Sequence, residues 1–194
     1  PRMLERDEIT RLLGAAGDDL RDLLSGALMT GARYGDLCRL QVRDYLADER
    51  MVRIAQSKTG KTLLQPLTPE GVRIFDRLTA GRAGAALVFT RADGSAWGPG
   101  DAARPMAAAV ASAKLENVTF KTTRATYGKL LLLATRDLEM VAKALGHSDS
   151  RITRKHYAQY MPSELATAVA KLPALGLAGG KVTRLAGKAR KAGA

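Results

Sequence analysis

The sequence predicts a mainly α domain with a small antiparallel β-sheet, an α+β fold. Apolar residues recur at helical spacing along most of the 194-residue chain. Only one pair of segments, residues 51–56 and 61–67, has the composition and spacing of strands. A hydrophobic content of 46% is enough to bury one substantial core. We therefore expect one domain over residues 1–175 and a separate tail over residues 176–194.

The N-terminal part of the chain predicts two helices. From Thr10 to Leu28 the apolar residues recur at helical spacing, and the pattern breaks near Gly14 to Gly17. Arg33 therefore follows directly on the end of the second helix.

The next segment predicts a β-hairpin. Residues 51–56 and 61–67 are joined by Lys58, Thr59 and Gly60, and the glycine can supply the positive φ that a tight hairpin turn needs. Lys58 is therefore expected at the tip of a hairpin.

The remaining domain predicts helices with recognisable ends. Thr68 and Pro69 suit the N-cap and the first position of a helix that runs to Leu78. The glycine-rich residues 94–100 predict a loop, and Gly146 can adopt the left-handed conformation that ends a helix. Further helices are expected at residues 101–114, 121–133, 138–145, 151–160 and 163–172.

The charge of the chain indicates a polyanionic partner. Lys and Arg number 31 against 19 Asp and Glu, which gives a formal net charge of +12. Nucleic acid is the first candidate for such a partner. After Pro173 the composition changes to Gly, Ala, Lys and Arg without periodicity, so residues 176–194 are expected to form a flexible basic tail.

Cysteine usage and hydropathy exclude several classes. Cys38 is the only cysteine, which excludes an intramolecular disulfide and any multi-cysteine zinc site and suits a reducing cytoplasm. No run of 18 apolar residues exists, so no transmembrane helix is expected. We expect a cytoplasmic protein.

Four basic boxes lead to one tyrosine, and this order carries the functional prediction. The boxes are TGARYGDL, SKTGK, KTTR and ALGH, and a tyrosine follows them in KHYAQY. Attack on a phosphodiester gathers negative charge on the phosphate oxygens, and aimed cationic donors stabilise that charge. The candidate catalytic residues are Arg33, Lys58, Lys121, Arg124, His147 and Tyr157.

Each residue type suits a role at a phosphate. A guanidinium is planar, permanently charged and bidentate, so Arg33 and Arg124 can hold nonbridging phosphate oxygens. The phenol of Tyr157 must lose a proton to act as nucleophile, and His147 is a natural proton acceptor or orienting donor.

The two lysines differ in what they can do. Lys58 on a hairpin tip could protonate a leaving 5′ oxygen as a general acid. A protonated Lys121 has three donors and no acceptor, so it can bind phosphate but cannot act as a base.

These boxes resemble the tyrosine recombinases, also called the phage integrase family, from about Leu4 to Leu172. Asp36 and Leu37 complete a T-G-x-R-x-x-E/D-L box, and KTTR stands where the family has H-x-x-R. The family usually has His at the position of Lys121 and also accepts Lys there. The hairpin lysine, the L-G-H box and the Y-A-x-Y/L setting of the nucleophile are matched at Lys58, His147 and Tyr157.

The resemblance implies a site-specific recombinase that cleaves and rejoins double-stranded DNA through a 3′-phosphotyrosine. It implies no metal and no nucleotide cofactor. It also implies a homotetramer on two duplexes with a C-terminal segment docked on a neighbouring protomer, accessory DNA-bending proteins, and a cytoplasmic, nucleoid-associated enzyme. The upstream domain that clamps DNA in the family is expected to be absent from this chain.

Other hypotheses remain open at this point. Residues 137–157 also resemble a helix-turn-helix that directs Arg151, Arg154 and Lys155 at DNA, so a pure DNA-binding protein would explain the charge. A recombinase-like domain without activity and a type IB topoisomerase are further alternatives. Tyr160, three residues after Tyr157, is the rival nucleophile.

Overall fold

The computed structural model describes residues 2–57, 60–147 and 149–160. Contacts gather residues Pro1–Met161 into one compact unit. Lys58 lies outside the described residues, as do the predicted helix 163–172 and the predicted tail 176–194. The domain boundary after residue 175 stays a prediction.

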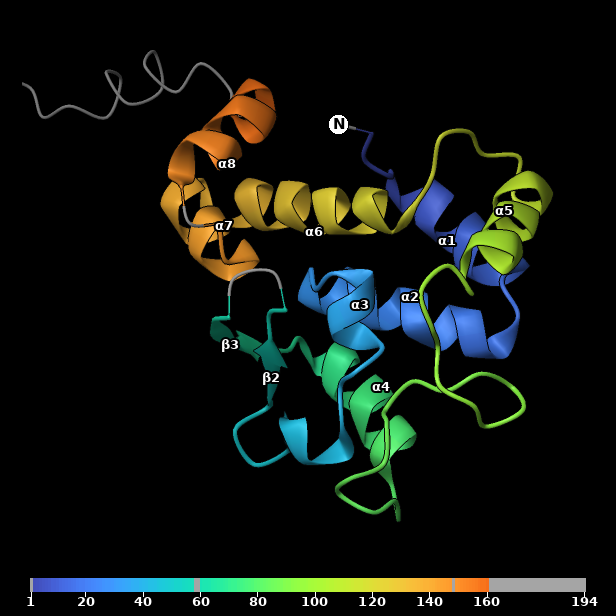
Figure 1. Ribbon diagram of the computed structural model, residues 1–194. Coiled ribbons are helices and arrows are strands. Elements are labelled where there is room, and N and C mark those ends of the chain that lie inside the picture. Colours follow the sequence, from blue (N-terminus) through green and yellow to red (C-terminus); the bar gives the residue numbers. More distant parts are fainter. Residues whose placement is uncertain (1, 58–59, 148, 161–194) are drawn as a thin grey trace, which may run out of the picture. The chain divides into compact units, whose positions relative to one another are not determined.

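The described chain is mainly helical with one small antiparallel sheet, as the sequence predicts (Figure 1). The α-helices are α1 (Arg6–Ala15), α2 (Asp18–Thr30), α3 (Tyr34–Leu37), α4 (Pro69–Thr79), α5 (Ala103–Ser112), α6 (Phe120–Thr135), α7 (Leu138–Leu145) and α8 (Ser150–Tyr157). The strands are β1 (Tyr45–Leu46), β2 (Met51–Ala55) and β3 (Thr62–Pro66), and two 3₁₀ turns are η1 (Val42–Asp44) and η2 (Ala158–Tyr160).

The predicted hairpin is confirmed as the pair β2 and β3. Its register runs from Met51 opposite Pro66 to Ala55 opposite Thr62, and Gly60 has the expected positive φ of 65°. Each strand is shorter than predicted, and β1 adds a third strand that the sequence did not indicate. Side chains alternate along β2 between core and solvent, which keeps one face of the sheet buried.

Local signals place most helix ends as expected. The Thr68 hydroxyl accepts a hydrogen bond from the Gly71 amide at 3.1 Å, which caps α4. Gly31 ends α2 with φ 65°, and Gly146 ends α7 with φ 63°. The predicted helix 151–160 is corrected, because α8 ends at Tyr157 and continues as the 3₁₀ turn η2.

Buried side chains form two clusters that meet along α2 and α6. The larger cluster joins α1, α2, α4, α5 and the sheet, and it includes Leu12, Leu23, Leu24, Val52 and Phe75. The smaller cluster joins α6, α7 and α8 through Ala125, Leu132, Val141, Leu145 and Tyr157. Helices α2 and α6 pack side by side between the clusters (Figure 1).

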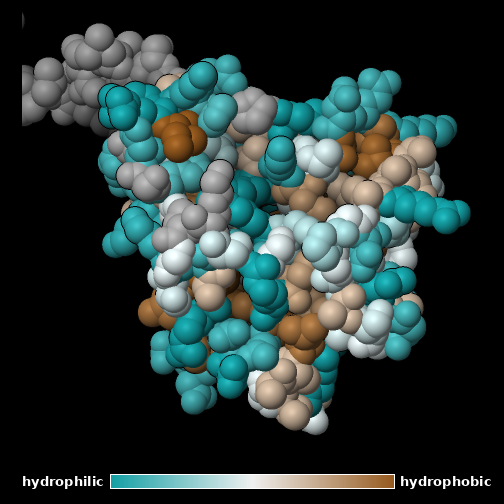
Figure 2. Space-filling model, in the orientation of Figure 1, coloured by the Kyte–Doolittle hydropathy of each residue, from teal (hydrophilic) through white to brown (hydrophobic). Residues whose placement is uncertain are grey.

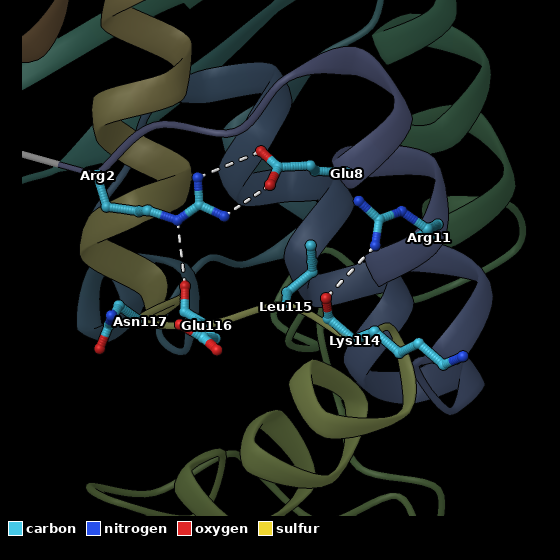
Figure 3. A pocket seen from close by; sticks show the side chains of 7 residues that line it. All are labelled: Arg2, Glu8, Arg11, Lys114, Leu115, Glu116 and Asn117. Carbon is cyan, nitrogen blue, oxygen red and sulfur yellow. Dashed lines mark hydrogen bonds and ion pairs between the residues drawn. The ribbon is translucent and has the colours of Figure 1, made fainter.

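The N-terminal segment fixes the start of α6. The Leu4 amide donates to the Thr126 hydroxyl at 2.8 Å in the interior. Arg2 pairs with Glu8 and donates to the Glu116 carbonyl at 3.1 Å (Figure 3). Arg11 donates to the Ala113 carbonyl at 2.8 Å and to the Lys114 carbonyl at 3.5 Å, of which Figure 3 shows the second. The residues that make these bonds line a polar hollow of about 340 Å³. The bonds attach α1 and the segment before it to the turn that precedes α6.

Candidate active site

Arg33 stands where the chain leaves the buried helix α2. Gly31 ends that helix in the left-handed conformation, and Arg33 then forms the N-cap position of α3. Its side chain is 28% exposed, and Nη1 lies 3.7 Å from the Asp36 carboxylate. That nitrogen is buried and has no hydrogen-bond partner among the described residues. A buried donor without an acceptor is costly, so this position favours an anionic ligand.

Asp36 links the Arg33 box to the hairpin. Its Oδ1 accepts hydrogen bonds from the Ser57 amide at 3.1 Å and the Ser57 hydroxyl at 2.9 Å. Arg39 donates to the same oxygen at 3.0 Å. Ser57 directly precedes Lys58 in the chain, so one buried carboxylate connects α3 with the start of the turn that carries this lysine.

Arg124 joins the ends of two other helices from the middle of α6. Its Nη1 donates to the Gly31 carbonyl at 2.8 Å, and its Nη2 donates to the Leu145 carbonyl at 2.5 Å. Through these two bonds Arg124 connects the end of α2, which precedes Arg33, with the end of α7, which precedes His147. Burial lowers the pKa of Arg124 to about 10, and the charge of Arg33 acts in the same direction. The guanidinium remains charged at neutral pH.

His147 follows the glycine that ends α7. The carbonyl of Leu145 also accepts a hydrogen bond from Gln56 Nε2 at 3.2 Å, and a Cβ on Gly146 would lie 2.5 Å from that same nitrogen. The tight approach between the base of the hairpin and this turn therefore needs glycine. On its other side, His147 Nδ1 lies 2.7 Å from the Thr153 hydroxyl of α8.

The charge state of His147 follows from its surroundings. Burial, the largest cause, and electrostatic interaction with Arg124, Arg33 and His156 together lower its pKa from 6.5 to about 4. The imidazole is therefore neutral at pH 7.

Tyr157 is the last residue of α8 and is only 3% exposed. Its ring packs closely on α6, because a Cβ on Gly128 would lie 2.5 Å from the phenolic oxygen. Burial raises the pKa of Tyr157, and the charge of Arg124 opposes that effect. The phenol is therefore neutral and protonated at pH 7, within reach of the field of Arg124.

Tyr160 has different neighbours. It lies in η2, and the ammonium of Lys129 stands 5.5 Å from the centre of its ring. The coupling to Arg124 thus favours Tyr157 over Tyr160 as the tyrosine nearest the charged centre.

A model of the Phage integrase family matches residues 2–164 of the chain that carries this site. The chain belongs to the phage integrase family. No characterised protein matches it in a comparison of sequences alone.

Solved structures of tyrosine recombinase catalytic domains share the fold of this integrase domain. XerA recombinase superposes with a TM-score of 0.70 at 21% identity, over 87% of this chain and 64% of XerA. The catalytic domain of bacteriophage HP1 integrase gives a TM-score of 0.69 at 24% identity, over 89% of this chain and 96% of that domain. The integrase of transposon Tn1549 gives 0.72 at 20% identity, over 88% and 64% of the two chains. The chain thus spans less than two thirds of XerA and of the Tn1549 integrase.

The two predicted lysines of the integrase domain are not among the residues that these contacts join. Lys121 lies exposed in the first turn of α6, one turn before Arg124, and its backbone amide donates to the Thr119 hydroxyl at 3.2 Å. Lys58 lies outside the described residues, between Ser57 and Gly60. The structure therefore gathers Arg33, Arg124, His147 and Tyr157, and Lys121 is exposed beside them.

The structure adds polar residues to the site that the sequence analysis did not single out. They are buried and contact either a predicted site residue or the turn that precedes one. Gln56 supports the turn before His147, and Thr153 contacts the imidazole itself. The only signal for Thr153 was its position four residues before Tyr157, on the same face of α8, and its contact with His147 crosses from α8 to the preceding turn. The surface over α7 and α8 is largely hydrophilic (Figure 2), and Arg151, Arg154 and Lys155 are exposed on α8.

No helix of the described chain is long and apolar enough to cross a membrane.

Proposed function

We propose that this integrase domain is the catalytic domain of a site-specific tyrosine recombinase that cleaves and rejoins DNA through a 3′-phosphotyrosine. The observation that carries the proposal is the position of Arg124. Its two carbonyl bonds hold the segments of Arg33 and His147 together, and its charge acts on Tyr157. Four elements, α3, α6, α7 and α8, therefore bring two arginines, a histidine and a phenol to one centre.

The donors left over at this centre suit a phosphate. A guanidinium has five N–H groups, and Arg124 commits two of them to carbonyls, so three remain for a ligand. Arg33 contributes the buried Nη1 that has no hydrogen-bond partner among the described residues. A phosphodiester group brings the acceptors and the negative charge that both arginines lack. Its charge would also raise the low pKa of His147.

The proposed reaction conserves the phosphodiester bond energy without a metal or a nucleotide. The Tyr157 oxygen forms a bond to phosphorus while the bond from phosphorus to the 5′ oxygen breaks. The 5′ oxygen takes up a proton, for which Lys58 is the proposed general acid, and Lys121 is proposed to bind phosphate. The phenolic proton passes to His147 or to water. In rejoining, a 5′-hydroxyl attacks the phosphotyrosine in the reverse sense.

The proposed partner is double-stranded DNA. Related solved structures include a lambda integrase dimer bound to a core site, XerH recombinase bound to its difH substrate, and Tn1549 integrase with circular intermediate DNA. We propose that this chain likewise acts on duplex DNA as a tetramer in the cytoplasm, with accessory DNA-bending proteins. The +12 charge supports the choice of DNA.

The test is covalent attachment to DNA. The chain is incubated with nicked duplexes whose sequence around the nick is randomised, and protein–DNA adducts are separated on a denaturing gel. The wild-type protein should form an adduct. Tyr157→Phe should abolish the adduct and retain DNA binding, because the ring stays while the attacking oxygen is removed.

Tyr160→Phe is the matched control and should leave attachment close to the wild-type level. An adduct that survives Tyr157→Phe, or one that Tyr160→Phe removes, assigns the nucleophile elsewhere. Binding without any adduct in the wild-type protein would favour the DNA-binding hypothesis over the enzyme.

A further inference from the structure

The Thr153 hydroxyl has an unusual partner for a helical threonine. Thr153 lies in α8 and is 0% exposed, and its hydroxyl oxygen stands 2.7 Å from His147 Nδ1. Other threonine hydroxyls in the described helices donate to backbone carbonyls: Thr122 and Thr123 to carbonyls five and three residues earlier, and five more to the carbonyl four residues earlier in their own helix. These five are Thr10, Thr30, Thr79, Thr126 and Thr135. The Thr153 hydroxyl makes no such bond to a carbonyl in the described part of the chain.

The direction of this hydrogen bond follows from the burial of the hydroxyl. A buried hydroxyl proton needs an acceptor, because leaving it without one costs about 1–3 kcal/mol. Among the described residues, the only partner of the Thr153 hydroxyl is His147 Nδ1. The hydroxyl therefore donates, and Nδ1 accepts through its lone pair. A neutral imidazole that accepts at Nδ1 carries its proton at Nε2.

We propose that Thr153 is a positioning residue that holds His147 in the Nε2–H tautomer, so that the imidazole acts as a hydrogen-bond donor and not as a base. Resting on the proposed function, this assigns Nε2–H to a nonbridging phosphate oxygen. The phenolic proton of Tyr157 then passes to water. Thr153 itself touches neither DNA nor the reacting atoms.

The charges around His147 agree with a neutral donor. Arg33, Arg124 and His156 act on the ring from α3, α6 and α8. Lys61, Lys143 and Glu139 line a hollow of about 410 Å³ that His147 also borders, between β3 and α7. The cations outnumber the single carboxylate. Burial, with the interactions of Arg124, Arg33 and His156, holds the pKa of His147 well below neutrality. An uncharged ring keeps one proton, and Thr153 decides which nitrogen holds it.

Nitrogen NMR of the full 194-residue chain tests the tautomer directly. The sequence has only two histidines, so ¹⁵N-histidine labelling gives two ring systems, and His156→Gln assigns them. At pH 7 we expect a protonated Nε2 and an unprotonated, hydrogen-bonded Nδ1 in His147. A proton on Nδ1 in the wild-type protein would overturn the proposal whatever the variants do.

Two substitutions separate the hydroxyl from the shape of the side chain. Thr153→Val keeps the volume and removes the hydroxyl, so the Nδ1 resonance should move away from its hydrogen-bonded position. Thr153→Ser keeps the hydroxyl and should preserve the wild-type resonance. An Nδ1 resonance that is the same in the valine variant and the wild-type protein would contradict the proposal.

Attachment to the randomised nicked duplexes supplies the functional readout. Thr153→Val should slow attachment about 10- to 100-fold, the usual range for the loss of an orienting partner of a histidine ligand. Thr153→Ser should stay close to the wild-type rate. Thr79→Val removes a helical hydroxyl of α4 far along the chain from the site, and it controls for loss of stability alone. Equal attachment rates for Thr153→Val and Thr79→Val would contradict the proposal that Thr153 positions His147.

The two proposals fail separately. If the wild-type protein forms no adduct but His147 shows the expected tautomer, the proposed function fails and the positioning role stands. If an adduct forms and Nδ1 carries the proton, only the role of Thr153 is lost.

Discussion

At the scale of single residues, the two arginines combine structural and functional demands. Arg124 uses two of its guanidinium N–H groups to bond the carbonyls of Gly31 and Leu145 and leaves its other N–H groups for a ligand. Arg33 leaves a buried nitrogen without a hydrogen-bond partner among the described residues. A lysine ammonium would keep the charge at either position, but it could not reproduce the planar set of parallel donors.

Arg33→Lys and Arg124→Lys should therefore reduce attachment severely despite the conserved charge. Loss of one oriented donor costs about 3 kcal/mol in comparable oxyanion sites, which is roughly 100-fold in rate. The measurement is the rate of adduct formation on the randomised nicked duplexes. Arg77→Lys, at an exposed ion pair with Asp22, is the matched control and should keep the wild-type rate. A wild-type rate in either site variant would contradict the phosphate-binding role of that arginine.

His147 gives the folded protein a specific dependence on pH. Its folded pKa is about 4 against an ordinary value of 6.5, chiefly because of burial. As the pH falls below 6.5, the unfolded chain binds a proton at this residue before the folded protein does. The contribution of His147 to the free energy of unfolding is therefore complete above pH 6.5 and is lost progressively toward pH 4.

Urea denaturation at a series of pH values measures this effect. His147→Gln should flatten the fall in the free energy of unfolding between pH 6.5 and pH 4, because the titrating group is gone. His156→Gln should leave the fall largely in place. An identical pH dependence in His147→Gln and the wild-type protein would show that the folded pKa of His147 is not lowered.

At the scale of elements, the site depends on how the hairpin and two helix ends meet. Asp36 and Gln56 connect the base of the hairpin to α3 and to the turn after α7. Gln65 of β3 donates to the hydroxyl of Tyr127 on α6. Buried glutamines and one carboxylate thus attach the hairpin to the elements that carry Arg33, Arg124 and His147.

The sequence predicted the helices, strands and turns well where the signal lies within a few neighbouring residues. The glycines at the end of α7 and in the hairpin turn were predicted because positive φ strongly favours glycine. The elements α3 and β1 were missed, because four residues and two residues are too short for a periodic pattern. The partners of Gln56 and Thr153 lie across tertiary contacts, which periodicity does not encode. The six site residues came from motif order, and burial of Tyr157 and its coupling to Arg124 add a physical reason to prefer it over Tyr160.

Gly146 offers a test of the approach between hairpin and turn. Gly146→Ala must place a side chain at φ 63° and also at 2.5 Å from the amide of Gln56. Gly81→Ala has a similar φ of 68° and nothing within 4 Å of the new Cβ. The control should lose about 1 kcal/mol of unfolding free energy from backbone strain alone. Gly146→Ala should lose clearly more and should also slow attachment, because the turn carries His147. Equal losses of stability in the two variants would mean that Gln56 moves aside freely.

At the scale of the whole molecule, the net charge of +12 sets the expected mode of DNA binding. Phosphate contacts release condensed counterions, and each neutralised phosphate contributes roughly −0.9 to the slope of log affinity against log salt concentration on duplex DNA. We expect affinity for a duplex of unrelated sequence to fall steeply between low and physiological salt, as measured by fluorescence anisotropy. Affinity that does not change with salt would exclude phosphate contacts as the main source of binding.

The C-terminal residues should account for a separable part of that slope. Residues 181–194 contain no acidic residue, and their basic residues are Lys181, Arg184, Lys188, Arg190 and Lys191. Replacing all five by Gln keeps the length of the chain and removes their five positive charges. The slope for unrelated DNA should then become shallower by at most roughly 4.5, if each residue contacts one phosphate. Attachment through Tyr157 should persist at low salt, because none of the proposed catalytic residues is changed. As a control, replacing five exposed arginines and lysines elsewhere on the domain tests whether any loss of charge has the same effect. If the slope stays the same after the C-terminal replacement, these five residues do not contact phosphate, and DNA binding depends on the net charge of 12 − 5 = +7 in the rest of the chain.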